Sequence, residues 1–265
     1  MEPAWTVALL WLLFGGAHIG LATRRVRATL VAALGEWGFM GLFSLVAAVT
    51  FTLAVNFYAT HRLDGAPGLA LGAMPALRGA LMAAVVIGVV LWSVALLEYP
   101  RGPMALFGDS VRAPYGFGRI TRHGFFVGVA LMAAAHALLA TRLVGTVLFG
   151  GVALFALLGA WHQDRKLLIL RGAPYAEYLA ATSTVPFAAI LTGRQHIAWR
   201  ELSASAVLAG IVTAIALRTV HGSIFAHGGA WVVGAVLAGA ALETLQAWRR
   251  AHHRPGSAHL ASRTT

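Results

Sequence analysis

The sequence predicts an all-α protein, a polytopic transmembrane helical bundle with about seven spans, with about six as the alternative count. Of the 265 residues, 59% are hydrophobic and only 11% are charged, a composition far from that of soluble globular domains. Several runs close to the length of a membrane-crossing helix carry almost no charge. Because backbone polar groups in lipid must find their hydrogen bonds internally, closed helices are the expected backbone throughout.

The expected spans, with ends placed to within about two to four residues, are 4–23, 37–58, 79–98, 121–141, 143–162, 204–220 and 227–247. The first follows Met-Glu-Pro-Ala and no basic stretch, and no small-residue cleavage site comes after it. We therefore interpret it as a span and not as a signal peptide.

Two segments outside the spans have separate expectations. The stretch near 173–192, interrupted by Thr184 and Pro186, is too short and broken for a span. We expect an interfacial or partly re-entrant element there, at the inner face of the membrane. Residues 1–250 are predicted to form a single transmembrane domain, and the polar stretch 251–265 a disordered cytoplasmic tail.

The distribution of positive charge predicts an N-out, C-in orientation. With an odd number of spans, 16 of the 20 Lys and Arg residues fall in connections on one side, which the positive-inside rule makes cytoplasmic. The remaining four are Arg62, Arg78, Arg142 and Arg218. The net charge of +11 therefore indicates topology first and attraction to anionic lipid second. It does not indicate nucleic-acid binding.

Histidines are the leading candidates for chemistry. Four lie inside or at the ends of the expected spans: His18, His123, His136 and His162. An ionisable ring in hydrocarbon is costly and usually faces the bundle interior, a ligand or an ion path. The sequence has no cysteine, which excludes disulfides, thiolate metal sites and thioether-linked haem. It also has no Gly-rich phosphate-binding loop and no Ser, His and Asp in the order of a catalytic triad.

Depth divides these histidines. His18 and His123 lie near the predicted cytoplasmic ends of two different spans. His136 is about 20 Å deeper than His123 and about 220° further round the helix, so the two cannot share a small ligand. Imidazoles on facing helices, which pack about 8–10 Å apart, can hold haem b by its iron. Gly15 and Gly16 leave room for a flat ring, although ordinary small-residue packing explains them equally well.

Plainer roles stay open for the other polar residues. His123 can be an interfacial ring beside lipid phosphates, and His136 a neutral, hydrogen-bonded core residue. His162, beside Trp161, can be an interface anchor. Glu243, near the inner end of the last span, can reach Arg249, Arg250 or the membrane interface.

Short blocks along most of the chain, roughly residues 8–225, resemble the NnrU family of bacterial membrane proteins. They are Gly118-Arg119-Ile120-Thr121-Arg122-His123-Gly124, Ala135-His136-Ala137-Leu138, His18-Ile19-Gly20, Gly35-Glu36-Trp37-Gly38-Phe39, Gly41-Leu42-Phe43-Ser44-Leu45, Gly159-Ala160-Trp161-His162-Gln163-Asp164-Arg165 and the stretch 186–194. The Arg-His-Pro usual in that family is Arg122-His123-Gly124 here, so the turn before the fourth span is expected to differ.

That family is similar to the plastid 15-cis-ζ-carotene isomerases, membrane haem b enzymes with paired histidine ligands. The resemblance implies haem b with His18 and His123 as the axial iron ligands. Further cofactor-binding residues that it implies are Arg122, His136, His162 and Asp164. It also implies a multi-pass protein of the bacterial inner (cytoplasmic) membrane, surrounded by membrane lipid. The role would be in nitrite and nitric oxide metabolism during denitrification, or in haem-dependent isomerisation of a lipophilic polyene, with a lipophilic or small-gas substrate.

Two alternatives remain. The spacing of Asp164, Gly172, Tyr175 and Tyr178 is similar to that of the isoprenylcysteine carboxyl methyltransferases, although Gln163-Asp164 replaces their paired glutamates. This resemblance implies S-adenosylmethionine at the cytoplasmic face, in a site lined by Arg122, His123, Asp164 and Tyr178. The other alternative is a non-enzymatic membrane transport or assembly factor for denitrification. The sequence leaves open whether the protein is an enzyme.

Overall fold

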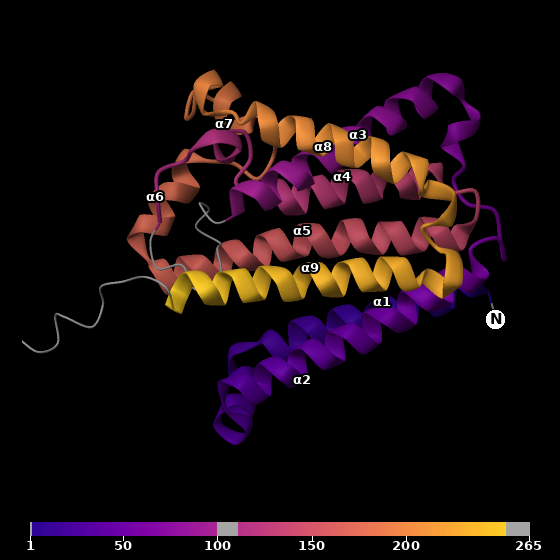
Figure 1. The fold of residues 1–265 in the computed structure, drawn as a ribbon, viewed down its shortest axis with the longest axis horizontal. Coiled ribbons are helices and arrows are strands. Elements are labelled where there is room, and N and C mark those ends of the chain that lie inside the picture. The colour runs from indigo at the N-terminus through magenta and orange to yellow at the C-terminus, as the bar shows by residue number, and fades with distance from the viewer. Residues whose placement is uncertain (1, 100–110, 253–265) are drawn as a thin grey trace, which may run out of the picture.

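The computed structural model describes residues 2–99 and 111–252, which form a bundle of helices running side by side (Figure 1). The long helices are α1 (Pro3–Ala22), α2 (Arg24–His61), α3 (Pro75–Glu98), α4 (Gly124–Leu139), α5 (Leu143–Arg171), α8 (Ala204–Thr219) and α9 (Ala226–His252). Within the described residues, 2–99 and 111–252, the only β-type pairing is an isolated bridge between Pro67 and Arg142. The prediction of an all-α bundle is confirmed.

Each predicted span is a helix, but the helices differ in length. Five of them, α1, α2, α3, α5 and α9, are long and apolar enough to cross a membrane, and many large apolar side chains on them are exposed. By these criteria the chain is a membrane protein. Helices α4 and α8 have 16 residues each. At about 1.5 Å per residue they are about 24 Å long, less than the hydrocarbon core of about 30 Å.

Each long helix packs against the next one across the bundle, in an order that differs from their order along the chain. Helix α8 packs on α3, α3 on α4, α4 on α5, α5 on α1, α1 on α2, and α2 on α9. Small residues allow a close backbone contact between α3 and α4. A Cβ atom on Gly88 would lie 2.7 Å from the Gly128 carbonyl oxygen, and one on Gly128 would lie 2.6 Å from the Trp92 nitrogen. Only glycine allows this approach, which is a common device in membrane bundles.

Helix α2 is interrupted at Gly35, where φ is +72° and ψ is 169°. The predicted span 37–58 starts just after this break. The prediction therefore located the membrane-length part of α2 but not the helical arm that precedes the break. That arm, residues 24–34, carries Arg27, whose guanidinium lies 2.7 Å from the Glu36 carboxylate. The arm adds an ion pair across the break, on the exposed surface.

Short elements gather at one end of the bundle, on the left of Figure 1. They are η3 (Gly116–Arg119), α6 (Ala173–Ala181), α7 (Ala188–Leu191) and η4 (Trp199–Glu201). The region predicted as interfacial, 173–192, forms α6 and α7, and the nine residues of α6 are too few to span a bilayer. Residues 251 and 252 continue α9, so the predicted tail does not begin at 251. Its remainder, 253–265, lies outside the described residues.

A bidentate ion pair fixes the end of the bundle that holds these short elements. Arg119 donates from Nε and Nη2 to the Glu201 carboxylate at 2.8 and 2.9 Å, and from Nη1 to Gln195 at 2.8 Å. The backbone N–H of Gly116 donates to the same carboxylate at 2.9 Å. These bonds lower the pKa of Glu201 to about 2. The pair ties η3, which precedes α4, to η4, which precedes α8.

Candidate functional site

His123 lies at the junction between η3 and α4. It is the residue before the helix, with φ −117° and ψ 43°, and it is 1% exposed. The neighbouring Thr121 donates to the Thr184 carbonyl at 2.7 Å, and the Arg122 N–H donates to the Ser183 carbonyl at 3.0 Å. The turn before α4 is therefore bound to the segment between α6 and α7, which holds His123 in place.

Asp164 on α5 joins the side chains around His123 into one network. Its Oδ1 accepts from His123 Nε2 at 2.7 Å and from the Tyr175 hydroxyl at 2.6 Å. Its Oδ2 accepts from Arg122 Nη2 at 2.7 Å and Nε at 3.0 Å. We call Arg122, His123, Asp164 and Tyr175 the Asp164 network. Charge-assisted bonds of this kind are short and strong, so Asp164 orients three side chains at once.

The tyrosines of α6 are held in the protonated form. Burial, followed by the hydrogen bond to Asp164, raises the pKa of Tyr175 far above its usual range. Burial also raises the pKa of Tyr178 to about 12. Tyr175 therefore remains a donor to Asp164 at any physiological pH. Its ring stacks on that of Tyr178 with the centroids 5.8 Å apart.

One nitrogen of His123 has no partner among the described residues. Nε2 faces Asp164, while the buried Nδ1 makes no hydrogen bond with any of them. In the neutral ring the proton is assigned to Nε2, because a carboxylate can only accept. Nδ1 then presents a lone pair, as in the carboxylate–histidine arrangements that support metal ligands.

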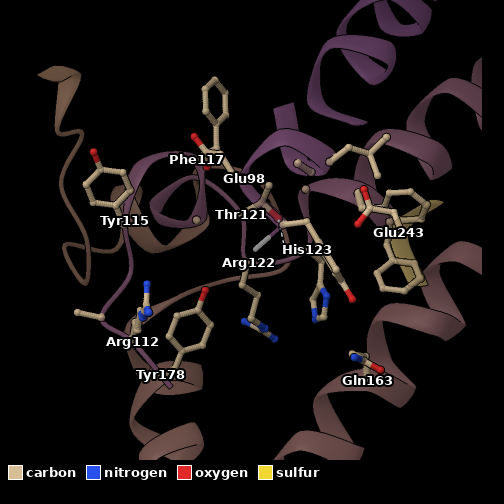
Figure 2. Close-up of a pocket in the computed structure, with 18 residues that line it drawn as sticks. Glu98, Arg112, Tyr115, Phe117, Thr121, Arg122, His123, Gln163, Tyr178 and Glu243 are labelled. Carbon is tan, nitrogen blue, oxygen red and sulfur yellow. Dashed lines mark hydrogen bonds between the residues drawn. The ribbon is translucent and has the colours of Figure 1, made fainter. Parts of the chain in front are cut away.

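A cavity of about 370 Å³ lies beside this histidine. Figure 2 shows Arg122, His123 and Tyr178 together with Gln163 at the same site. The lining is mostly apolar and comes from the end of α3, the segment 112–123, the start of α4, and single residues of α5, α6 and α9. It includes the carboxylates of Glu98 and Glu243. This volume is within the range of small-molecule sites, about 300–1,000 Å³.

The structure brings together three of the six predicted cofactor-binding residues, namely Arg122, His123 and Asp164. His136 lies far along α4, where its Nδ1 bonds the Met132 carbonyl at 2.8 Å. There its ring is 5.0 Å from that of Phe149, between centroids. This agrees with the predicted separation of His136 from His123.

His18 and His162 lie on another face of α5. The ring of His18 packs among Phe14, Phe43 and Phe155, with centroids 4.7 to 5.5 Å away, and His162 is near enough to act on it electrostatically. Positions 162 and 164 of a helix point about 200° apart at about 100° per residue. Helix α5 therefore lies between His18 and His123. Neither His18 nor His162 lines the cavity.

Two side chains of the candidate site were missed or misplaced in the prediction from the sequence. Tyr175 was noted only for its spacing, and it donates to Asp164. Glu243 was expected to reach Arg249, Arg250 or the interface, and the structure places it on the cavity beside His123 (Figure 2). A carboxylate within an apolar span is itself a signal of a site, and it could have indicated this role.

Comparison with known proteins identifies the family. The family model described as NnrU protein matches residues 6–228, which is most of the chain. The chain belongs to the NnrU family. Among individual relatives, it is 29% identical over 202 residues to the chloroplastic 15-cis-zeta-carotene isomerase of Arabidopsis thaliana, covering 73% of this chain and 52% of the relative. The match to the isomerase of Zea mays is 29% over 199 residues, covering 71% and 51%.

This NnrU protein thus spans about half the length of the curated relatives it matches. No solved structure matches it.

Haem b, which the family resemblance implies, fits the residues in part. His18 and His123 each keep a buried ring nitrogen without a hydrogen-bond partner among the described residues, as an axial ligand requires. His123 also has the carboxylate support and the adjacent cavity. With α5 between the two rings, however, one haem cannot lie between both histidines in this arrangement. The residues fit a haem held by His123 Nδ1.

Proposed function

We propose that this NnrU protein is a membrane isomerase-like protein that binds a lipophilic polyene in the cavity beside His123. The support is the family membership together with two relatives described as 15-cis-zeta-carotene isomerases. One observation supports this choice of site. His123 is buried, its Nδ1 has no hydrogen-bond partner among the described residues, and it lines a mostly apolar cavity. Isomerisation about a double bond adds and removes no atoms, so the site needs to bind, orient and shield the polyene.

Each part of the site has a role in this proposal. Phe125 and Phe126 line the apolar side of the cavity and would contact the polyene chain. The Asp164 network fixes the direction of His123 Nδ1, because three donors converge on one carboxylate. A fixed direction matters because a misplacement of about 1 Å can cost a hundredfold in rate.

We further propose haem b in this site, held by His123 Nδ1. When bound, its iron would supply a centre that interacts with the double bond and lowers the barrier to rotation. Asp164 would orient Nδ1 of His123 toward the iron, and Phe125 and Phe126 would keep water away. We propose His18 as the second ligand only for an arrangement in which α5 no longer separates the two rings.

The isomerase proposal is tested in cells that accumulate 15-cis-ζ-carotene. Expression of the protein is expected to convert this isomer to the 15-trans form, measured by chromatography of the extracted pigments. His123→Ala should abolish the conversion, while the exposed Glu177→Gln on α6 should leave it unchanged. Absence of conversion by wild-type protein, present at normal level in the membrane, would reject a carotene substrate.

The haem proposal is tested by the absorption spectrum of detergent-purified protein. We expect a Soret band that His123→Ala removes and His18→Ala leaves in place. Loss of the band in His18→Ala alone would move the ligand to His18. If haem-supplemented protein has no Soret band, haem is not bound.

A second candidate function is S-adenosylmethionine-dependent methyl transfer. One observation favours it: Arg122, His123 and Asp164 meet, and Tyr178 lines the same cavity, as that resemblance implies. The carboxylates of Glu98 and Glu243 could accept hydrogen bonds from ribose hydroxyls. Calorimetry with S-adenosylhomocysteine distinguishes the two functions, because saturable binding by folded protein is expected only for a methyltransferase.

A further inference from the structure

Two buried acceptor atoms in the cavity have no hydrogen-bond partner within residues 2–99 and 111–252. One is His123 Nδ1 and the other is Glu243 Oε2. His123 directly precedes α4 and Glu243 lies on α9, and both residues line the same cavity. Buried polar atoms in proteins are nearly always paired. Two unpaired atoms on one cavity therefore indicate a ligand that pairs them.

The position of Glu243 in α9 supports the same conclusion. The residue lies within the apolar segment Ala226–Gln246 of α9, which is long enough to span a membrane. An ionisable side chain in such a segment is expensive unless it faces a partner or a site. Figure 2 shows Glu243 facing the cavity that His123 lines.

The free atoms define the chemistry of the ligand. An ionised carboxylate only accepts hydrogen bonds, and a protonated one keeps an accepting oxygen. In its neutral form, with the proton on Nε2, His123 also accepts at Nδ1. The ligand must therefore present hydrogen-bond donors to this part of the cavity. A phosphate or carboxylate group would present only acceptors to these two atoms.

The cavity has a second, apolar part. Ala95, Leu96, Phe125 and Phe126 line it from α3 and α4, two helices whose backbones approach closely at Gly88 and Gly128. A ligand with a long apolar chain can use this wall while its polar end meets Glu243 and His123.

We infer that, when His123 Nδ1 holds no haem, this cavity takes a lipophilic molecule whose polar end carries a hydrogen-bond donor, a hydroxyl or an amine, received by Glu243 and His123. A carotene is a hydrocarbon and has no such group, so this ligand differs in class from the compound that the relatives are named for. The inference rests on the proposed site and deepens it. It does not require the carotene reaction.

The test compares retinoids that share one polyene and differ at the end group. Retinol and retinyl methyl ether have the same polyene, but only retinol donates a hydrogen bond. Their binding to detergent-purified, full-length protein is measured by quenching of tryptophan fluorescence, with protein-free micelles as the blank. A site built to pair a donor rejects an analogue without it, so retinol is expected to bind at least about tenfold more tightly than the ether.

Variants connect this preference to Glu243. Glu243→Leu removes the acceptor and should reduce the retinol preference to below about twofold, since one acceptor bond is lost. Glu243→Gln keeps an accepting oxygen and should retain most of it. Glu177→Leu, on the exposed face of α6, is the matched control and should behave as wild type. Gel filtration checks that each variant is folded and monodisperse.

Retinylamine and retinoic acid complete the comparison. Tighter binding of the amine than of retinol supports a cationic end group, and the reverse supports a neutral hydroxyl. Equal affinities for retinol and its methyl ether, no saturable binding of any of these retinoids, or tightest binding of retinoic acid would each overturn the inference. Failure of carotene isomerisation would leave these results unaffected, so the two proposals fail separately.

Discussion

At the scale of single residues, Asp164 organises the site. Its carboxylate accepts hydrogen bonds from Arg122 and His123, which directly precede α4, and from Tyr175 on α6. The side chains of Asp164 and Arg122 are each only 14% exposed, so the ion pair lies largely out of water. A buried pair contributes little net stability by itself, but removing one partner is strongly destabilising.

This makes a graded prediction for two substitutions. Asp164→Ala leaves Arg122 buried without its partner and is expected to destabilise the protein by about 3–5 kcal/mol. Tyr175→Phe removes one bond to a charged group and should cost about 1.5–3 kcal/mol. Thermal unfolding in detergent, followed by circular dichroism, measures both. Glu177→Gln is the control, and a similar small effect for all three would contradict the role given to Asp164.

At the scale of elements, glycine spacing sets how closely helices approach. The α3–α4 contact has backbone atoms within 2.6 to 2.8 Å of where a Cβ would stand on Gly88 or Gly128. The same start of α4 carries His123 and the cavity wall. Widening the α3–α4 contact would therefore change the cavity as well as the packing.

Gly128→Ala is expected to lower the thermal midpoint clearly, because the new methyl group meets backbone on α3. Gly150→Ala is the matched control, since a Cβ there has no atom within 4 Å and alanine favours a helix by about 1 kcal/mol over glycine. Differential scanning fluorimetry in detergent compares the two. A Gly128→Ala midpoint equal to or above the control would show that the helices can move apart freely.

The Arg119–Glu201 pair joins η3 to η4, and its pH dependence follows from the Glu201 pKa. That pKa falls from its ordinary value of 4.5 to about 2 in the folded protein. A depressed carboxyl pKa gives stability that is present above about pH 4.5 and is lost as the pH falls through about 2. The stability difference between wild type and Glu201→Gln should shrink over that window.

Urea or thermal unfolding of both proteins from pH 6 to the lowest pH that the folded state tolerates would measure this difference. A difference that does not change as the pH falls below about 4.5 would mean that Glu201 does not titrate with a shifted pKa.

At the scale of the whole molecule, the basic connections lie at one end of the bundle. The turn between α1 and α2, the residues before α4, the α5–α8 connection and the end of α9 share that end (Figure 1). This agrees with their predicted placement on one side of the membrane. That this side is the cytoplasm remains a prediction from the positive-inside rule.

Single cysteines can test the orientation cleanly, because the chain has none of its own. Asp64→Cys lies in the connection between α2 and α3, and Glu177→Cys lies on α6 at the opposite end. We expect a membrane-impermeant maleimide to label Asp64→Cys in intact spheroplasts and Glu177→Cys only after lysis. The reverse pattern would invert the topology.

Much of the fold could be predicted from the sequence, because hydrophobic length and charge placement act locally along the chain. The location of every long helix followed from them, and so did the short elements in 173–192. The break at Gly35 could not be predicted, since a single glycine in an apolar run is usually tolerated within a helix. The lengths of α4 and α8 also escaped, because the ends of helices are the least predictable part.

The site was only partly predictable, since it depends on which faces of the helices meet. Arg122, His123 and Asp164 were named from motifs, and the structure brings them together. His18 was predicted at a depth in the membrane similar to that of His123. Depth alone does not show that α5 lies between the two rings. A carboxylate within the last apolar span could indicate a site, but which cavity Glu243 lines depends on how α9 packs against the other helices. Haem and the link to nitrogen-oxide metabolism stay predictions.

Helix α9 has a particular consequence for how this site can diversify. The family match ends at residue 228, close to where α9 begins, and Glu243 lies well beyond it. One wall of the cavity is thus supplied by a helix outside the part of the chain that defines the family. Exchanging that helix would leave the Asp164 network intact while it replaces the group that meets the ligand's polar end. Ligand choice and the structural core can therefore change independently in this protein.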